Sequence, residues 1–331
     1  MVNVNTQWYH QFCENLPDVD TKDKIFVITG TTSGTGFVAA RTVAAKGGTV
    51  VLLNRMSSRS KDSLAKLQQA VPCGTFVPIQ CDLQNFASVT NAIETIKNRY
   101  DKIYCLANNA GIMATPDKAT VDGYDTQMQT NHLSHFLLTA ELYPLLEKGA
   151  EEWGEARIVN HSSFGRNEVT SKQLEQKYLE KNGGNLGGDS VGFMSGACFE
   201  RYFQTKLANS VFSYGLHDKL QAKGSKVRAM DAHPGGSTTS LGDNLDYGFF
   251  WNMALKLVGP YRMQSPEDGA MGLIKGMLDP EAESGVLYGP ANNATKGLPV
   301  PNPPEPYEND PESIDMLWRT SEAATGVKFE I

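Results

Sequence analysis

The fold of this chain is decided by the stretch IFVITGTTSGTG at residues 25–36. It begins with five residues that are apolar or β-branched, as in a strand buried on both faces, and three glycines lead into an amphipathic segment at 37–46. Glycines let a pyrophosphate approach the amide groups at a helix N-terminus, where the helix dipole favours negative charge. The stretch therefore predicts a strand, a phosphate-binding turn and a helix.

The same alternation of short apolar runs and amphipathic segments continues along the chain. Apolar runs predict strands at 49–53, 76–81, 103–107, 157–161 and 227–232, and the segments between them predict helices at 60–70, 86–99, 125–148 and 199–221. Helices of this length imply right-handed crossovers, and therefore an α/β fold: a doubly wound Rossmann fold with a mostly parallel sheet flanked by helices. Pro78 lacks an amide donor, which predicts an edge position for the third strand, as in the order 3-2-1-4-5-6.

Residues 1–22 are interpreted as an N-terminal extension and residues 23–331 as a single nucleotide-binding domain. Within that domain, residues 166–197 form an insertion whose glycines predict a mobile flap. Residues 240–263 are rich in aromatic side chains and are interpreted as a substrate lid, with ordinary core as the alternative. Residues 299–331 are expected to form an extended surface strap, rich in proline, and a last helix.

Composition narrows the class of protein. A net charge of -7 argues against nucleic acid or an anionic membrane surface as a general partner. The 331 residues contain neither a run of 18 apolar residues nor a secretory signal, which predicts a cytoplasmic protein, although membrane association through an aromatic segment stays possible. The five cysteines are scattered and odd in number, which predicts reduced core thiols, and no metal site is expected. The oligomeric state stays open.

The residues after the second strand indicate which nucleotide is bound. Asn54 and Arg55 stand where a carboxylate would hold a free ribose diol, so that nothing repels a 2'-phosphate and Arg55 can pair with one. The alternative is that Arg55 is simply solvated. We therefore expect NADP(H) rather than NAD(H). Asp82 and Leu83 would face the adenine, and the segment 108–111 would pass close behind the ribose.

Tyr202 and Lys206 lie four residues apart in a predicted helix, so both side chains can reach one point. A positive charge beside a phenol favours the phenolate and would bring its pKa toward the range used in proton transfer. Such a pair often arises by chance, so a catalytic role is inferred only together with the other motifs. His161 and His233, by contrast, are expected to be structural.

Taken together, these stretches resemble the short-chain dehydrogenase/reductase family. The matching motifs occur in the family's order at 29–36, 82–83, 108–111, Asn131, Ser163, Tyr202 with Lys206, and 234–239. Within the family, the segments 131–139, 206–209 and 317–322 look most like retinol dehydrogenases and light-dependent protochlorophyllide reductases. Tyr202 follows Ser163 by 39 positions, more than in the shorter members, so the pocket wall contains an insertion that the shorter members lack.

The resemblance implies four catalytic residues. Tyr202 would be the general acid or base, Lys206 would hold the nicotinamide ribose and lower the tyrosine pKa, and Ser163, rather than Ser162, would bind the substrate oxygen. Asn131 would support a water that relays protons toward Lys206. The expected cofactor-binding residues are Thr29, Gly30, Thr32, Ser33, Gly34, Thr35, Gly36, Asn54, Arg55, Asp82, Leu83, Asn109, Ala110, Gly111, Tyr202, Lys206, Pro234, Gly235 and Thr239.

The resulting hypothesis is an NADPH-dependent oxidoreductase that interconverts a carbonyl and an alcohol on a mostly apolar small molecule. Three alternatives stay open: an NADPH-dependent C=C reductase of the protochlorophyllide type, a non-catalytic NADP(H)-binding sensor, and, more distantly, a nucleotide-sugar epimerase. The resemblance does not identify the substrate.

Overall fold

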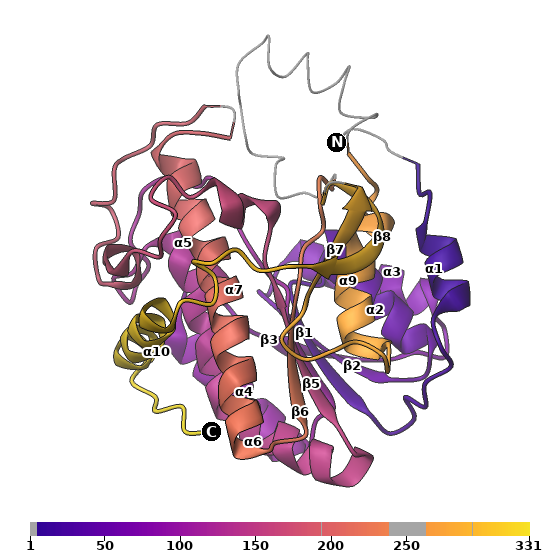
Figure 1. Ribbon diagram of the computed structural model, residues 1–331. Coiled ribbons are helices and arrows are strands. Elements are labelled where there is room, and N and C mark those ends of the chain that lie inside the picture. The colour runs from indigo at the N-terminus through magenta and orange to yellow at the C-terminus, as the bar shows by residue number, and fades with distance from the viewer. Residues whose placement is uncertain (1–4, 193, 238–262, 293) are drawn as a thin grey trace.

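A computed structural model describes residues 5–192, 194–237, 263–292 and 294–331. Their sheet has eight strands in the order β3-β2-β1-β4-β5-β6-β7-β8, parallel throughout except that β8 runs antiparallel to β7 (Figure 1). The strands are β1 (Ile25–Thr29), β2 (Thr49–Asn54), β3 (Thr75–Gln80), β4 (Cys105–Asn108), β5 (Ala156–His161), β6 (Val227–Ala232), β7 (Leu287–Asn292) and β8 (Lys296–Asn302). The doubly wound fold and the edge position of β3 are confirmed.

Helices cover both faces of the sheet and enclose a hydrophobic core on each side (Figure 1). On one face lie α1 (Tyr9–Asn15), α2 (Gly34–Ala45), α3 (Ser58–Ala70) and α9 (Pro266–Leu278). On the other lie α4 (Phe86–Arg99), α5 (Thr126–Met128), a π-helical turn at Gln129–Leu133, α6 (Ser134–Trp153), α7 (Ala197–Lys223) and α10 (Pro311–Thr325). Short 3-10 helices span Phe164–Glu168 and Gln176–Leu179 within the insertion.

Local sequence signals set several of the helix ends. Ser57 and Ser60 form a reciprocal capping box at the start of α3. Asn85 caps α4, and Asp310 caps α10 immediately before a proline at its first position. Helices α6, α7 and α10 each end at a glycine in the left-handed region, which an L side chain adopts only with strain.

The C-terminal part differs from the prediction. Helix α9 and strands β7 and β8 were not predicted, and in the two strands Pro290, Pro299 and Pro301 interrupt the strand pattern. Strand β8 lies at the sheet edge, where a missing amide donor is tolerated. The strap expected from residue 299 begins inside β8. It was expected to lie on the surface, but the Glu308 side chain within it is buried.

The N-terminal extension packs against the domain. The main-chain N–H groups of Gln7, Trp8 and Tyr9 each donate to the buried carboxylate of Asp268 on α9, at 2.9 Å. Asp268 thus satisfies three amides at the start of α1, which would otherwise lack acceptors.

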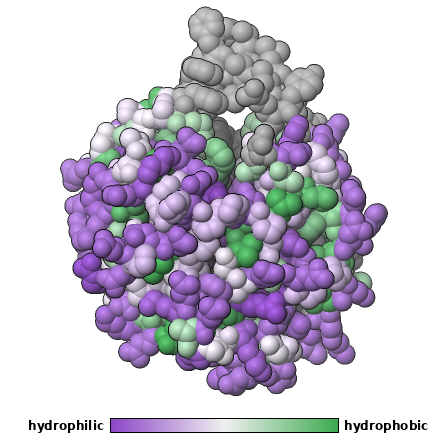
Figure 2. Space-filling model, viewed as in Figure 1, coloured by the Kyte–Doolittle hydropathy of each residue, from purple (hydrophilic) through white to green (hydrophobic). Residues whose placement is uncertain are grey.

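The face seen in Figure 2 is largely hydrophilic, with apolar residues scattered over it. Cys81, Cys105 and Cys198 are buried thiols, as predicted, whereas Cys13 is only partly buried and Cys73 is exposed. Among the described residues, no helix is both long and apolar enough to cross a membrane.

Candidate active site

The turn between β1 and α2 is shaped by close backbone packing. Gly30 has a φ of +71°, and a Cβ there would lie 2.8 Å from Ala110, while a Cβ at Gly36 would lie 2.3 Å from Asn109 Nδ2. Asn54 braces the turn from β2: its Oδ1 accepts from the Thr31 amide at 2.9 Å, and its Nδ2 donates to Thr31 Oγ1 at 2.7 Å. The turn is therefore fixed in place at the N-terminus of α2, where an anion would bind.

Two arginines lie beside this turn. Arg55 follows β2, and Arg59 on α3 donates to Ser33 Oγ at 2.6 Å. Arg59 was not assigned to the site from the sequence, which placed it before the helix expected at 60–70. Asp82 is the one carboxylate among the described residues that line the cavity.

Tyr202 and Lys206 lie at the far end, on the buried face of α7. Lys206 Nζ donates to the main-chain oxygen of His161 at 2.8 Å and lies 5.8 Å from the centroid of the Tyr202 ring. Both side chains are less than 5% exposed. Helix α7 thus directs the phenol and the ammonium toward the end of β5.

The electrostatics of the pair differ from the prediction. Burial raises the pKa of Tyr202 to about 12, while its side-chain hydrogen bond with Ser163 lowers it. Burial also lowers the pKa of Lys206 to about 8, with Asp231 opposing that change. The pKa of Tyr202 is therefore raised rather than lowered as predicted, because loss of hydration outweighs the hydrogen bond with Ser163. Tyr202 keeps its proton at neutral pH.

The two serines after β5 have different surroundings. Ser162 is fully engaged with the protein: its Oγ donates to the main-chain oxygen of Lys206 at 2.8 Å and accepts from Ser210 Oγ at 3.0 Å. Ser163 Oγ accepts from the Gly165 amide at 3.1 Å and hydrogen-bonds to Tyr202. This leaves Ser163 as the serine that shares a polar contact with the phenol, and its substrate-binding role stays a prediction.

Asn131 lies in the π-helical turn, a feature found often at functional sites. Its side chain bonds both polar main-chain atoms of Ile112, at 2.8 and 2.9 Å, and donates to Thr205 Oγ1 at 2.9 Å. These bonds fix the loop after β4 beside Lys206. Support of a water by Asn131 stays a prediction.

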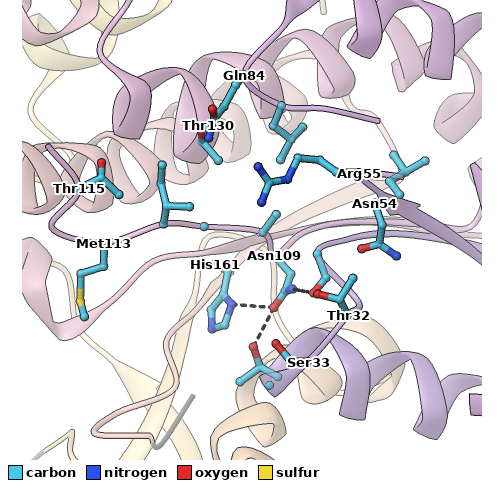
Figure 3. A pocket seen from close by; sticks show the side chains of 18 of the residues that line it. Thr32, Ser33, Asn54, Arg55, Gln84, Asn109, Met113, Thr115, Thr130 and His161 are labelled. Carbon is cyan, nitrogen blue, oxygen red and sulfur yellow. Dashed lines mark hydrogen bonds between the residues drawn. The ribbon is translucent and has the colours of Figure 1, made fainter. Parts of the chain in front are cut away.

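One cavity of about 470 Å³ joins the glycine turn to the tyrosine end (Figure 3). The predicted residues that line it are Gly30, Thr32, Ser33, Gly34, Thr35, Asn54, Arg55, Asp82, Leu83, Asn109, Ala110, Gly111, Tyr202, Lys206 and Pro234. Thr29, Gly36, Asn131, Ser163 and Gly235 are not part of this lining, and Thr239 is outside the described residues. Residues not assigned from the sequence that also line it are Leu53, Ser57, Arg59, Cys81, Gln84, Ile112, Met113, Ala114, Thr115, Pro116, Thr130, His161 and Ser162, so that Ser162 rather than Ser163 is the serine in the lining.

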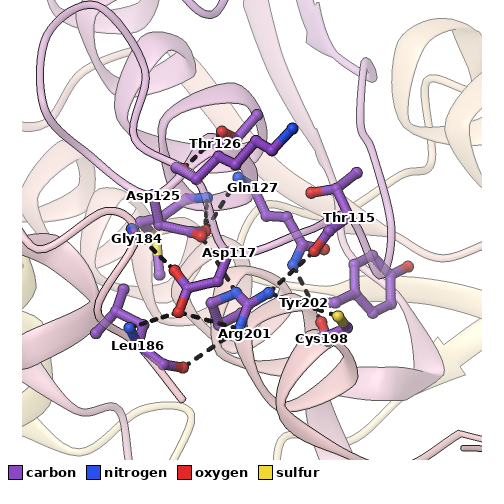
Figure 4. Close-up of polar contacts among 12 residues, drawn as sticks. Thr115, Asp117, Asp125, Thr126, Gln127, Gly184, Leu186, Cys198, Arg201 and Tyr202 are labelled. Carbon is purple, nitrogen blue, oxygen red and sulfur yellow. Dashed lines mark hydrogen bonds and ion pairs between the residues drawn. The ribbon is translucent and has the colours of Figure 1, made fainter. Parts of the chain in front are cut away.

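Part of the insertion is bonded to a buried charge cluster (Figure 4). Asp117 accepts from the amides of Gly184, Leu186 and Gly188 at 2.7 to 3.0 Å. Arg201, adjacent to the catalytic tyrosine candidate, donates to Gly188 O at 2.7 Å and lies within 4 Å of the Asp117 and Asp125 carboxylates. The segment 184–188 is therefore bonded to Asp117 and Arg201, and the mobility of the insertion stays a prediction.

Arg201 also connects this cluster to the cavity, since it donates to the main-chain oxygen of Thr115 at 3.0 Å. The glycines at 183–188 suggested mobility because glycine adds freedom to an isolated chain, and here Asp117 bonds the amides they expose. The predicted lid at 240–263 lies, except for Met263, outside the described residues.

The strap reaches the back of the site. Arg166 donates to the main-chain oxygen of Ser163 at 3.1 Å, and its Nε lies 2.6 Å from the Glu308 carboxylate. Both side chains are buried. The segment between β8 and α10 therefore supports the turn that carries Ser163.

The chain is similar in sequence to several known proteins. The model of the short chain dehydrogenase family matches residues 24–173. The short-chain dehydrogenase/reductase prx1 of Penicillium roqueforti is 30% identical over 307 residues, which cover 91% of this chain and 84% of that protein. Polyprenol dehydrogenase of Homo sapiens is 29% identical over 311 residues, covering 92% of this chain and 86% of that protein.

Solved structures show the same fold. A crystal structure of an uncharacterized protein from Mycobacterium paratuberculosis is 27% identical with a TM-score of 0.72, covering 96% of this chain and 98% of that chain. A short chain dehydrogenase from Escherichia coli CFT073, crystallised with NADPH, is 20% identical with a TM-score of 0.59, covering 82% of this chain and 98% of that chain.

Proposed function

Because the chain belongs to the short-chain dehydrogenase/reductase family, we propose that it is an NADP(H)-dependent oxidoreductase that interconverts a carbonyl and an alcohol on a mostly apolar small molecule. The observation that carries this proposal is the continuous cavity, which has a glycine turn and two arginines at one end and Tyr202 with Lys206 at the other. A dinucleotide needs that combination: anion-binding amides, a site for an extra phosphate, and a proton donor near the reacting carbon.

The lining residues fit a cofactor with a 2'-phosphate. Close packing of Gly30 against Ala110 and of Gly36 against Asn109 fixes the turn at the N-terminus of α2, and Arg55 and Arg59 supply positive charge beside it. Ser33, already in contact with Arg59, adds a hydroxyl at the same corner.

When bound, the nicotinamide would supply or accept the hydride. Tyr202, protonated at neutral pH, is prepared to donate a proton to a carbonyl oxygen, and Ser163 would hydrogen-bond to the same oxygen. Lys206, with a pKa of about 8, is mainly charged at neutral pH and would hold the ribose hydroxyls. Tyr202 and Lys206 are both less than 5% exposed, which limits the access of water to the proton donor.

Exposed apolar side chains after Ser163 and in the insertion support an apolar substrate. Phe164, directly after Ser163, and Val191 and Met194 in the insertion are large hydrophobic residues that are 38 to 45% exposed. The name of the human relative refers to a polyprenol, which agrees with this class of substrate.

Replacement of Tyr202 by phenylalanine tests the proposed reaction. The variant Tyr202→Phe keeps the ring but removes the proton donor, so we expect carbonyl reduction to fall by at least about 100-fold while the Kd for NADPH changes little. NADPH oxidation is measured against aldehydes, ketones, quinones and retinoids, with Tyr100→Phe as the control at a position remote from the cavity. Full activity of Tyr202→Phe would contradict the proposed role. Wild-type protein that binds NADPH but reduces none of these compounds would favour the sensor hypothesis.

A further inference from the structure

His161 occupies the junction between the glycine turn and the catalytic end. It is the last residue of β5, its ring lines the cavity, and its main-chain oxygen accepts from both Lys206 Nζ at 2.8 Å and Asn209 Nδ2 at 3.1 Å. The residue is 6% exposed. From the sequence we expected His161 to be structural, and these main-chain contacts alone would agree with that role.

The surrounding hydrogen bonds determine which ring nitrogen carries the proton. Asn109 Nδ2 donates to the main-chain oxygen of Thr29 at 2.8 Å, so the Oδ1 atom of that amide must point the other way. Oδ1 accepts from Thr35 Oγ1 at 2.9 Å and lies 2.9 Å from His161 Nδ1 (Figure 3). Because an amide oxygen can only accept, Nδ1 carries the proton and donates.

Nε2 is consequently a hydrogen-bond acceptor. Burial and the nearby charge of Lys206 lower the pKa of His161 to about 3, so the ring is neutral in ordinary buffers. A neutral imidazole protonated at Nδ1 has a lone pair at Nε2, which can bind an N–H or O–H group.

This acceptor has no partner among the described residues. Nε2 of His161 is buried without a hydrogen bond, whereas His135 and His233 each have a partner at both ring nitrogens. A buried acceptor without a donor destabilises the protein, and such atoms are uncommon in native structures. Since the ring lines a cavity, a group that enters the cavity can supply the donor.

We propose that His161 Nε2 binds the nicotinamide riboside half of the cofactor by accepting a hydrogen bond from a ribose hydroxyl or the carboxamide N–H. This inference rests on the proposed function, which places that half of the dinucleotide beside Tyr202 and Lys206. Lys206 offers only donors and His161 only an acceptor, so the two residues together can hold a group that both accepts and donates. A ribose hydroxyl is such a group.

Two variants separate the acceptor from the structural bond. In His161→Asn the side-chain amide can take the place of Nδ1 and keep the bond to Asn109, but nothing remains at Nε2. In His161→Gln the amide oxygen reaches the position of Nε2 and keeps an acceptor there. We expect the Kd for NADPH to rise about tenfold in His161→Asn and less than threefold in His161→Gln, measured by fluorescence titration. His217→Asn, at a histidine remote from the cavity, is the matched control and should leave the Kd unchanged.

Fragments of the cofactor identify the donor. 2',5'-ADP lacks both the second ribose and the nicotinamide, and its affinity should be equal in wild type and His161→Asn. 2'-Phospho-ADP-ribose has the ribose alone, so weaker binding of it by the variant assigns the donor to a hydroxyl, and unchanged binding assigns it to the carboxamide. Equal weakening of 2',5'-ADP, or an unchanged Kd for NADPH in His161→Asn, would overturn the proposal. If wild-type protein bound no NADPH, the proposed function itself would fail.

Discussion

At the scale of single residues, the pKa values of Tyr202 and Lys206 predict how the reaction depends on pH. Tyr202 keeps its proton to about pH 12, whereas Lys206 loses its charge as the pH rises through about 8. Carbonyl reduction should therefore be steady below pH 7 and decline above 8, with Lys206 as the group that titrates.

The variant Lys206→Arg tests this assignment. Arginine stays charged over the whole range, so the decline near pH 8 should disappear even if the overall rate is lower. The measurement is the pH profile of kcat and of kcat/KM for wild type and variant. An inflection near pH 8 that persists in Lys206→Arg would assign the titration to another group.

Arg55 is expected to choose between the two dinucleotides. Arg55→Asp would place a negative charge where the 2'-phosphate is held, so the Kd for NADPH should rise about 10- to 100-fold and NADH should become relatively better. The ratio of kcat/KM for the two cofactors measures this, with Arg99→Asp on α4 as a control that changes the same charge far from the cavity. An unchanged ratio would show that Arg55 is only solvated.

At the scale of elements, Arg201 joins the insertion, the loop after β4 and helix α7. Replacement by methionine keeps the apolar stem but leaves the Asp117 and Asp125 carboxylates buried without a cation. Loss of one partner from a buried ion pair costs about 3–5 kcal/mol, and we expect a decrease of that size in the free energy of unfolding.

Urea unfolding and limited proteolysis measure the effect of Arg201→Met, and cleavage should appear within residues 183–192. Arg319→Met is the matched control, since the ion pair of Arg319 with Asp315 is exposed and contributes little. If both variants were equally stable, the cluster would not be what anchors the insertion.

At the scale of the whole molecule, Asp268 attaches the N-terminal extension to the domain. Asp268→Asn replaces one carboxylate oxygen with an N–H donor facing main-chain amides, so we expect a loss of about 1–3 kcal/mol in stability and faster hydrogen exchange over α1. The neighbouring Glu267→Gln changes the same charge on a partly exposed side chain and serves as control. Slow exchange over α1 in Asp268→Asn would mean that side-chain packing alone holds the extension.

Sequence alone determined the Rossmann order of the first six strands, the edge position of β3 and the family, because buried parallel strands are continuous apolar runs and the motifs are local. It did not predict β7 and β8, whose prolines are tolerated only through their positions in the sheet.

The tertiary structure alone decided the properties that depend on burial and on contacts between distant segments. Burial raised the pKa of Tyr202 where the adjacent lysine predicted a decrease, and Asp117 accepts hydrogen bonds from glycines that predicted a mobile flap. His161 is the clearest case: its tautomer follows from Asn109 and Thr35, 52 and 126 positions earlier in the chain, and no local pattern around residue 161 contains that information.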